Sequence, residues 1–260
     1  MSGDSWRLPE LADGEAWRAL SANNLALQWE HLPRTMGGRW ERWDAVWAAD
    51  TASPVAFPNS ATLLRPLSAS GAGDLIVRLD QFYQQVAGGP WMLWSAWPTP
   101  DLALYGMRLA GYPPLMARLP DPLSVASELR IVEARSESDM RDFDEAMIHG
   151  YPISELHFPA DRISDERALG GPMRYFVGYR DGRPVACAAA CVGEHEVGVY
   201  MVATLPEARG KGYGAALTAA ATAIAPSLPA VLQASDLGQP VYRRLGFQVI
   251  SPYTLWYKPR

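Results

Sequence analysis

The sequence contains few of the residues from which disulfides and metal sites are built. It has two cysteines and four histidines in 260 residues. Cys187 and Cys191 lie in a segment that we expect to be one strand, so about 13 Å separates them, too far for a disulfide. We expect both to be small core residues in a reducing compartment. The histidines show no ligand spacing such as H-E-x-x-H, so we expect no metal site.

Lysine is scarce, and long apolar runs are absent. Two of the 23 basic residues are lysines, and a net charge of -5 offers no attraction to nucleic acid or anionic lipid. No stretch is long and apolar enough to span a bilayer. Residues 1–6 have neither the basic nor the apolar part of a signal peptide. We therefore expect a cytoplasmic protein without nucleic-acid or membrane partners, and its arginine-rich composition suggests a bacterial source.

Tryptophan is abundant and unevenly distributed. Nine of the ten tryptophans precede residue 100, so the two parts of the chain need different cores. Pro120 and Pro122 would interrupt any helix or strand. We therefore predict two domains, residues 1–122 and 123–260. The Trp-rich face of the first could be a core, an interdomain contact or the surface of a homodimer.

Periodicity predicts the elements of the first domain. One helix is expected over 14–31 and another over 39–48, where Trp40, Trp43 and Trp47 recur at i, i+3 and i+7. We interpret their shared face as a core stripe rather than a ligand cage. The other expected elements are an apolar segment at 61–64, a helix at 74–86, a buried strand at 91–97 and a short helix at 102–110.

The second domain has the pattern of an α/β fold with a mixed sheet. Three closely spaced strands at 174–179, 184–192 and 195–203 predict an antiparallel meander. The remaining expected elements are strands at 129–132 and 230–234, helices at 136–148, 162–169, 210–225 and 239–245, and one or two strands in the tail to residue 258.

The most informative stretch is a strand followed by a basic, glycine-rich loop and a helix. Its loop is Arg209-Gly210-Lys211-Gly212-Tyr213-Gly214. The unpaired N–H groups and the dipole at a helix N-terminus attract phosphate oxygens, and glycines let a diphosphate approach the backbone. Arg209 and Lys211 can add charged hydrogen bonds. The pattern therefore predicts a pyrophosphate site.

Two other phosphate-binding motifs fit this loop less well. Residues 210–215 match the dinucleotide pattern G-x-G-x-x-A, which needs a parallel βαβ unit and an acidic residue about twenty positions further on. Here the preceding strand ends an antiparallel meander, and the residues at that distance are Pro229, Ala230 and Val231. A P-loop is excluded because no Gly-Lys-Ser/Thr triplet is present.

In its strand-loop-helix setting, the loop resembles motif A of the GCN5-related N-acetyltransferase (GNAT) superfamily, R/Q-x-x-G-x-G/A, with residues 245–247 as a downstream match. The resemblance covers about residues 131–257 and implies a GNAT-like fold with acetyl-CoA as co-substrate. The residues that it assigns to acetyl-CoA are Val202, Ala203 and Thr204, whose backbone would pair with the pantetheine arm, and Arg209, Gly210, Lys211, Gly212, Tyr213 and Gly214, which would hold the pyrophosphate.

The first domain resembles the degenerate, GNAT-like N-terminal half of some two-part bacterial members of this superfamily. Residues 57–60 and 89–94 are among those that carry the resemblance. A weak similarity between residues 105–112 and 242–247 suggests an internal duplication. Residues 71–73 are glycine-rich but have no basic partner, so we expect one cofactor site rather than two.

The resemblance also implies roles in acyl transfer, which needs a base for the amine, a donor for the oxyanion and an acid for the thiolate. It places the oxyanion donor at the N–H of Val202 and the acid at Tyr242, although a buried tyrosine there could equally be a core residue. Some members carry a glutamate base where this sequence has Gly198. Glu196 lies on the same strand face and is the candidate base, and deprotonation through a water chain or with backbone assistance is the alternative.

Two functions are compatible with these observations. The first is N-acetyltransfer from acetyl-CoA to a primary amine of a small molecule, with a protein N-terminus or a thiol left open as acceptor. The second is a non-catalytic acyl-CoA-binding or interaction module, which the missing glutamate at Gly198 favours. The intact loop and Tyr242 favour the first, which we prefer.

Overall fold

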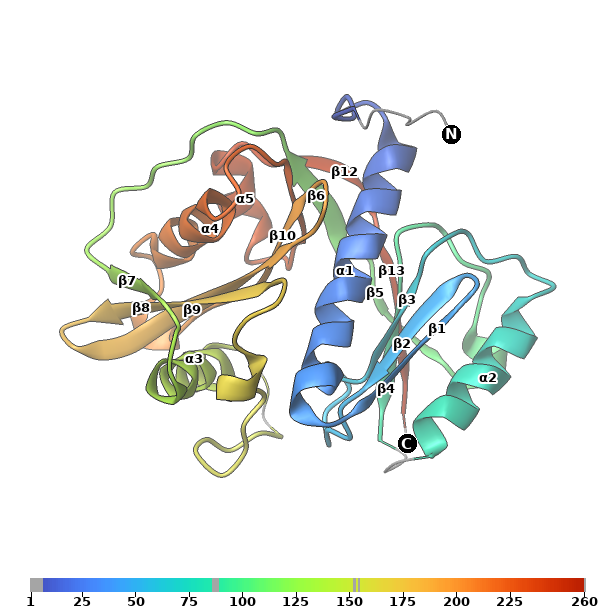
Figure 1. Cartoon of the computed structure of the whole chain (residues 1–260). Coiled ribbons are helices and arrows are strands. Elements are labelled where there is room, and N and C mark those ends of the chain that lie inside the picture. The colour runs from blue at the N-terminus through green and yellow to red at the C-terminus, as the bar shows by residue number, and fades with distance from the viewer. Residues whose placement is uncertain (1–6, 86–88, 152, 154, 260) are drawn as a thin grey trace.

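The computed structural model describes residues 7–85, 89–151, 153 and 155–259, which form two mixed β-sheets with helices on their faces (Figure 1). The predicted α/β class with a mixed sheet is confirmed. The first part contains α1 (Gly14–Met36), β1 (Arg39–Trp43), β2 (Val46–Asp50), β3 (Ser60–Leu63), α2 (Ala72–Gln84), β4 (Trp91–Ser95), η1 (Ala103–Tyr105), β5 (Arg108–Gly111) and β6 (Pro114–Arg118). The second contains β7 (Arg130–Glu133), α3 (Glu137–Gly150), η2 (Glu166–Ala168), β8 (Met173–Arg180), β9 (Arg183–Val192), β10 (Val197–Thr204), η3 (Pro206–Ala208), α4 (Tyr213–Ala223), β11 (Ala230–Gln233), α5 (Gln239–Arg244), β12 (Gln248–Pro252) and β13 (Thr254–Lys258).

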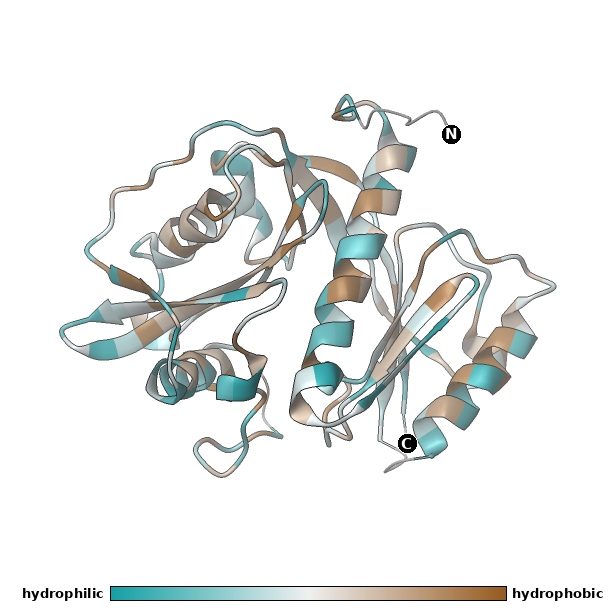
Figure 2. Cartoon of the chain, viewed as in Figure 1, coloured by the Kyte–Doolittle hydropathy of each residue, from teal (hydrophilic) through white to brown (hydrophobic). Residues whose placement is uncertain are grey.

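Helix α1 lies between the two sheets (Figure 1) and contacts strands of both. It begins at Asp13, whose carboxylate accepts a hydrogen bond from the N–H of Ala16 (3.1 Å). It ends at Gly37, which has φ 89° and donates its N–H to the carbonyl of Pro33. Hydrophilic and hydrophobic residues alternate along its whole length (Figure 2), since both sheets cover it and several of its buried residues are polar.

The two sheets exchange one strand each. The first sheet has the order β1-β2-β3-β4-β13-β5 and the second β12-β6-β11-β10-β9-β8-β7. Strand β6 pairs with β11 and β12 of the second sheet, whereas β13 pairs with β4 and β5 of the first. The predicted boundary at residue 122 therefore does not coincide with the division between the sheets. Backbone hydrogen bonds tie the two parts of the chain together.

The two sheets repeat one topology. The first sheet has the order β1-β2-β3-β4-β13-β5. If the second sheet is followed in the opposite direction from β8, its order is β8-β9-β10-β11-β6-β12, which matches the first strand for strand. Each sheet has one parallel pair, β3–β4 in the first and β10–β11 in the second. Helix α2 connects the first parallel pair and α4 the second. Gly106 (φ 75°) follows η1 as Gly246 (φ 85°) follows α5. The structural counterpart of Gly246 is therefore Gly106, whereas the sequence similarity of residues 105–112 to residues 242–247 matches Gly111 with Gly246.

The predicted helix at 39–48 is wrong, because this segment is the hairpin of β1 and β2. Trp43 pairs with Val46 across a two-residue turn, and the rings of Trp40 and Trp47 stack with centroids 5.9 Å apart. Spacings of three and seven residues fit one helix face, but a tight hairpin brings the same side chains together across two strands.

The predicted helix at 102–110 is also wrong. Only the single turn η1 forms, since Gly106 takes the left-handed conformation directly after it. The chain then continues as β5, which pairs with β13. A strand that is supplied by the far end of the chain thus determines the conformation of this segment.

Most of the predicted helix at 162–169 is irregular, and only η2 is helical. The N–H groups of Ile163 and Ser164 donate to the Asp144 carboxylate on α3 (3.2 Å each) instead of to helical carbonyls. The predicted helix at 74–86 is found as α2, although residue 86 lies outside the described residues.

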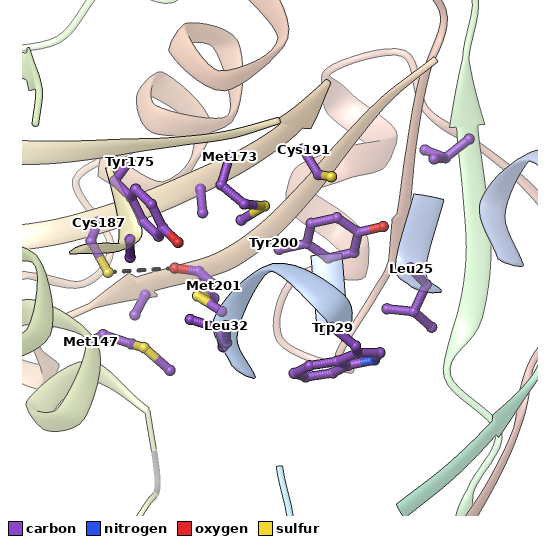
Figure 3. Packing of buried hydrophobic residues seen from close by; sticks show 14 of the residues in the cluster. Leu25, Trp29, Leu32, Met147, Met173, Tyr175, Cys187, Cys191, Tyr200 and Met201 are labelled. Carbon is purple, nitrogen blue, oxygen red and sulfur yellow. Dashed lines mark hydrogen bonds between the residues drawn. The ribbon is translucent and has the colours of Figure 1, made fainter. Parts of the chain in front are cut away.

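Three large layers of apolar residues hold the molecule together. One lies between the first sheet and α2, one between the second sheet and helices α4 and α5, and the largest lies among α1, α3 and the second sheet. Figure 3 shows part of the largest layer, where Trp29 of α1 lies near Tyr200 of β10 and Leu32 of α1 lies near Met201. Cys187 and Cys191 are buried there as free thiols, which confirms the expectation from their spacing.

Candidate functional site

The second sheet opens where β10 and β11 separate. These parallel strands pair only at Val197–Ala230 and Gly198–Val231. From residue 199 to 204, β10 has no strand partner on this side among the described residues. The backbone groups along this edge can therefore pair with an extended ligand.

Strand β10 has a parallel neighbour as well as the antiparallel one that the sequence predicts. Strand β10 ends the meander antiparallel to β9, but it is parallel to β11 and, with α4, forms a βαβ unit. A dinucleotide site is still disfavoured, because no acidic residue stands at 229–231.

A bulge interrupts β10 in the middle of the open edge. The pairing with β9 shifts register between Tyr200 and Ala203, and Met201 has φ 51°. The thiol of Cys187 on β9 donates to the Met201 carbonyl (3.4 Å; Figure 3). In a planar trans peptide the C=O and N–H point in opposite directions, so the N–H of Val202 points away from Cys187. This geometry fits an oxyanion donor at Val202.

The predicted phosphate loop leads from this edge into α4. Gly210 and Gly212 both have φ 77°, and no atom lies within 4 Å of where a Cβ would stand on either. The first hydrogen bond of the helix runs from Ala216 N–H to Gly212 O (3.0 Å), so the N–H groups of the three preceding residues have no partner within the helix. The loop thus combines open space with free donors, as a diphosphate requires.

The side chains around the loop differ in what they can do. The Arg209 guanidinium donates to the carbonyls of Thr204 (3.2 Å) and Gly150 (3.0 Å), so it joins the end of β10 to the end of α3. Lys211 is exposed. Tyr213 is buried in the layer under α4, and its hydroxyl has no hydrogen-bond partner among the described residues.

The structure thus brings the nine predicted cofactor residues to one edge. Residues 202–204 form its open strand, and residues 209–214 form its loop. A Cβ on Gly214 would lie 3.8 Å from Val202 Cγ1 and 3.9 Å from Thr204 Oγ1, so the first turn of α4 packs beside this strand. The residues fit acetyl-CoA, although their role in binding it stays a prediction.

Tyr242, the predicted acid, lies on α5 and is 9% exposed. Burial raises the pKa of its hydroxyl, and Tyr151 raises it further. A raised pKa keeps the phenol protonated at neutral pH, as a proton donor must be. Tyr151, which directly follows α3, was not predicted, because no local pattern distinguishes it from other tyrosines.

Glu196, the predicted base, precedes β10 and lies up to about 20 Å along the strand from Val202. It is 5% exposed, and burial raises its pKa. Its carboxylate accepts a hydrogen bond from the amide of Asn24 on α1 (2.7 Å). Asn24 Oδ1 in turn accepts one from the Tyr200 hydroxyl (2.8 Å). Glu196 is therefore joined to the first part of the chain, and its role as base stays a prediction.

Asn24 also explains the glycine at position 198. A Cβ there would stand 1.9 Å from Asn24 Oδ1 and 2.4 Å from the ring of Tyr200. The space of a glutamate side chain at this position is thus filled by a polar pair from two halves of the protein. The sequence could not reveal this pair, because 176 positions separate its members.

Residues 171–249 match the family model of the acetyltransferase (GNAT) domain. The match covers the open edge, the loop and Tyr242. Residues 171–249 are therefore similar in sequence to the GNAT acetyltransferase domain. No curated protein sequence matches the chain significantly.

Solved structures resemble nearly the whole chain. A GCN5-related N-acetyltransferase from Kribbella flavida has a TM-score of 0.64 at 21% identity, covering 94% of this chain and 96% of that one. A protein assigned to the GNAT family from Novosphingobium aromaticivorans has 0.57 at 19%, with coverages of 97% and 100%. A tandem GNAT protein from the clavulanic acid biosynthesis pathway has 0.53 at 15%, with 96% of each chain covered. The whole chain thus has the fold of two-part GNAT proteins.

Two further findings concern membranes and metals. In the part of the chain that the structure describes, every helix is too short or too polar to cross a bilayer. The same residues contain no group of three or more histidine, cysteine or acidic side chains that could hold a metal ion.

Proposed function

We propose that this protein transfers the acetyl group of acetyl-CoA to a primary amine of a small molecule. The observation that carries the proposal is the open edge of β10, which passes the bulge at Met201 and leads into the glycine loop before α4. This edge can pair with a pantetheine arm, and the free N–H groups of the loop can donate to a diphosphate.

The residues at the edge supply what acetyl transfer needs. Acetyl-CoA brings the activated acetyl group. The N–H of Val202 stabilises the oxyanion that develops on the carbonyl, and Tyr242 donates a proton to the departing sulfur. Arg209 holds the loop against the end of α3, and the ammonium group of the exposed Lys211 binds phosphate.

One observation favours a second candidate, a non-catalytic acyl-CoA-binding module. Asn24 and Tyr200 fill the space beside Gly198, where some GNAT members carry a glutamate base. A protein of this kind would bind acetyl-CoA without turnover.

Thermal unfolding with and without acetyl-CoA tests the binding part of the proposal. At a hundred times its dissociation constant, acetyl-CoA should add about 2.7 kcal/mol of stability, whereas NADH and ATP should add none. Gly212→Asp should abolish this effect. The matched control is Gly182→Asp in the β8–β9 turn, since Gly182 has φ 78° and equally open surroundings. An equal loss in both variants, or stabilisation by NADH alone, would contradict the assignment.

Release of free CoA thiol on addition of small amines then separates the two candidates. Amine-dependent release supports the transferase. Binding of acetyl-CoA without release from any amine supports the non-catalytic module.

A further inference from the structure

A pocket of about 250 Å³ lies where helix α1 of the first half meets the segment between η2 and β8 of the second half. It is separate from the open edge of β10 and from the glycine loop, since none of their residues line it. The helix contributes one face, with residues spaced three or four positions apart. The residues that line the pocket are Leu27, Glu30, His31, Arg34 and Thr35 of α1, and Leu169, Gly170, Gly171 and Pro172 of the segment.

His31 is a buried histidine of this lining, and its hydrogen bond defines which nitrogen carries the hydrogen. The side chain is 6% exposed, and Nε2 lies 2.8 Å from the carbonyl oxygen of Ala168. A carbonyl oxygen can only accept, so Nε2 donates its hydrogen to it. Burial lowers the pKa of the ring, which is therefore neutral at pH 7. In the neutral ring the other nitrogen, Nδ1, is an acceptor.

The Nδ1 acceptor lies on the pocket side of the ring. A Cβ on Gly171, which lines the pocket, would stand 3.5 Å from Nδ1 and 3.4 Å from the neighbouring Cε1 of His31. Gly171 has φ 66°, a conformation that favours glycine, so no side chain covers this edge of the ring. Among the described residues, Nδ1 has no hydrogen-bond partner. The pocket therefore presents a buried acceptor that has no donor.

The remaining polar side chains of the lining are bonded within α1. Arg34 donates to the carboxylate of Glu30 (2.6 Å), so the two charges compensate each other. The hydroxyl of Thr35 donates to the carbonyl of His31 (2.8 Å). The two leucines and the proline of the lining supply apolar walls. The pocket thus combines an unpartnered acceptor with apolar walls and no net charge.

We propose that this pocket is a second ligand site, which binds a small uncharged molecule with a compact apolar body and one hydroxyl group. The hydroxyl donates to Nδ1 of His31, and the apolar body lies against the leucines and the proline. A volume of about 250 Å³ is below the range of drug-sized ligands and suits a single ring, as in phenol. An ionic ligand is disfavoured, because the Glu30–Arg34 pair leaves no charge to compensate it. This site lies outside the proposed acetyl transfer and joins the two halves of the chain.

NMR titrations with phenol and with toluene test the acceptor. Both should bind to the unaltered protein and shift resonances of the lining residues. In His31→Phe, which removes Nδ1 and keeps a ring, the affinity for phenol relative to toluene should fall about tenfold, because the hydroxyl loses its acceptor. The ratio of the two affinities cancels the different costs of removing the two molecules from water. An unchanged ratio, or no binding of phenol to the unaltered protein, would overturn the proposal.

A larger side chain in the lining tests the place of binding. Leu27→Trp should abolish phenol binding, because Leu27 is a half-buried residue of the lining and the indole would occupy the space. The matched control is Leu20→Trp, at another half-buried leucine of α1 that does not line the pocket. Thermal unfolding checks that both variants fold. Binding that persists in Leu27→Trp, or that is lost equally in both variants, would overturn the assignment of the site.

Gly212→Asp separates this inference from the proposed function. It should abolish stabilisation by acetyl-CoA and leave phenol binding unchanged, since the pocket shares no residue with the loop. Leu27→Trp should have the opposite effects. Loss of phenol binding in Gly212→Asp would overturn the second site. Failure of acetyl-CoA to stabilise the unaltered protein would overturn the proposed function alone.

Discussion

The two sheets have the same strand order but differ at the place where one of them opens. In the second sheet, β10 has eight residues and pairs with β11 at only two positions. In the first, β3 has four residues and pairs with β4 at three. One parallel pair is thus open along most of its length, and the other is closed. Topology alone does not make a cofactor site.

Local sequence explains why the first sheet stays closed. The Asn59 side chain, 1% exposed, donates to the carbonyl of Pro90 (3.1 Å) and so joins the starts of β3 and β4. The rings of Tyr83 and Trp91 stack 4.8 Å apart in the layer beneath. Helix α2 begins after Gly71, whose φ of -91° differs from the left-handed φ of 77° at Gly212 before α4. No basic residue lies next to Gly71 in the sequence. The first half keeps the same strand order, but its own side chains join β3 to β4.

We expect the largest effect in an experiment that tests whether only the second half binds acetyl-CoA. Titration calorimetry should find one molecule per chain. Gly212→Asp should weaken binding at least 100-fold, because it puts a charge and a side chain where the diphosphate would lie. Gly71→Asp, at the equivalent N-cap in the first half, should leave affinity unchanged. Binding of two acetyl-CoA molecules per chain would contradict the difference between the two halves.

A second test compares Tyr242 on α5 with Tyr105, a tyrosine of the turn η1 in the first half. Tyr242→Phe should lower kcat 10- to 100-fold and leave acetyl-CoA affinity unchanged, because it removes the proton donor and keeps the ring. Tyr105→Phe in η1 should have no effect on kcat. Steady-state kinetics of both variants measure the difference in kcat. Equal values of kcat in both variants would show that Tyr242 is not the proton donor.

The smallest expected effect concerns the contact between the halves. Asn24→Ala should lower the free energy of unfolding by about 1–3 kcal/mol, because it leaves the Glu196 carboxylate buried without its amide donor. Burial raises the pKa of Glu196 in the folded protein above the ordinary value of 4.5. The protonated carboxyl group therefore stabilises the fold fully below pH 4.5, and this stabilisation is lost as the pH rises through the pKa of the folded state. Asn24→Ala raises that pKa further, so the loss should be larger at pH 8 than at pH 4. Urea unfolding at both pH values measures it, and an equal loss would contradict the pairing.

Several features of this protein could be predicted from sequence alone. The meander, the glycine loop with α4 and the short helix before Gly246 were predicted because alternation, turn residues and glycine conformation are local properties. The burial of Cys187 and Cys191 follows from the same strand pattern. These local features were sufficient to indicate the GNAT resemblance of the second half.

Only the tertiary structure decided how the two halves are joined. Strands β6 and β13 change places, and Trp40 meets Trp47 across a hairpin instead of along a helix. Asn24 reaches Glu196 across 172 positions. Such contacts depend on which distant segments meet, and a periodicity of two or 3.6 residues carries no information about that choice. The sequence therefore determined where the glycine loop lies, and the packing of α1 determined that Asn24 covers the face of β10 at Gly198.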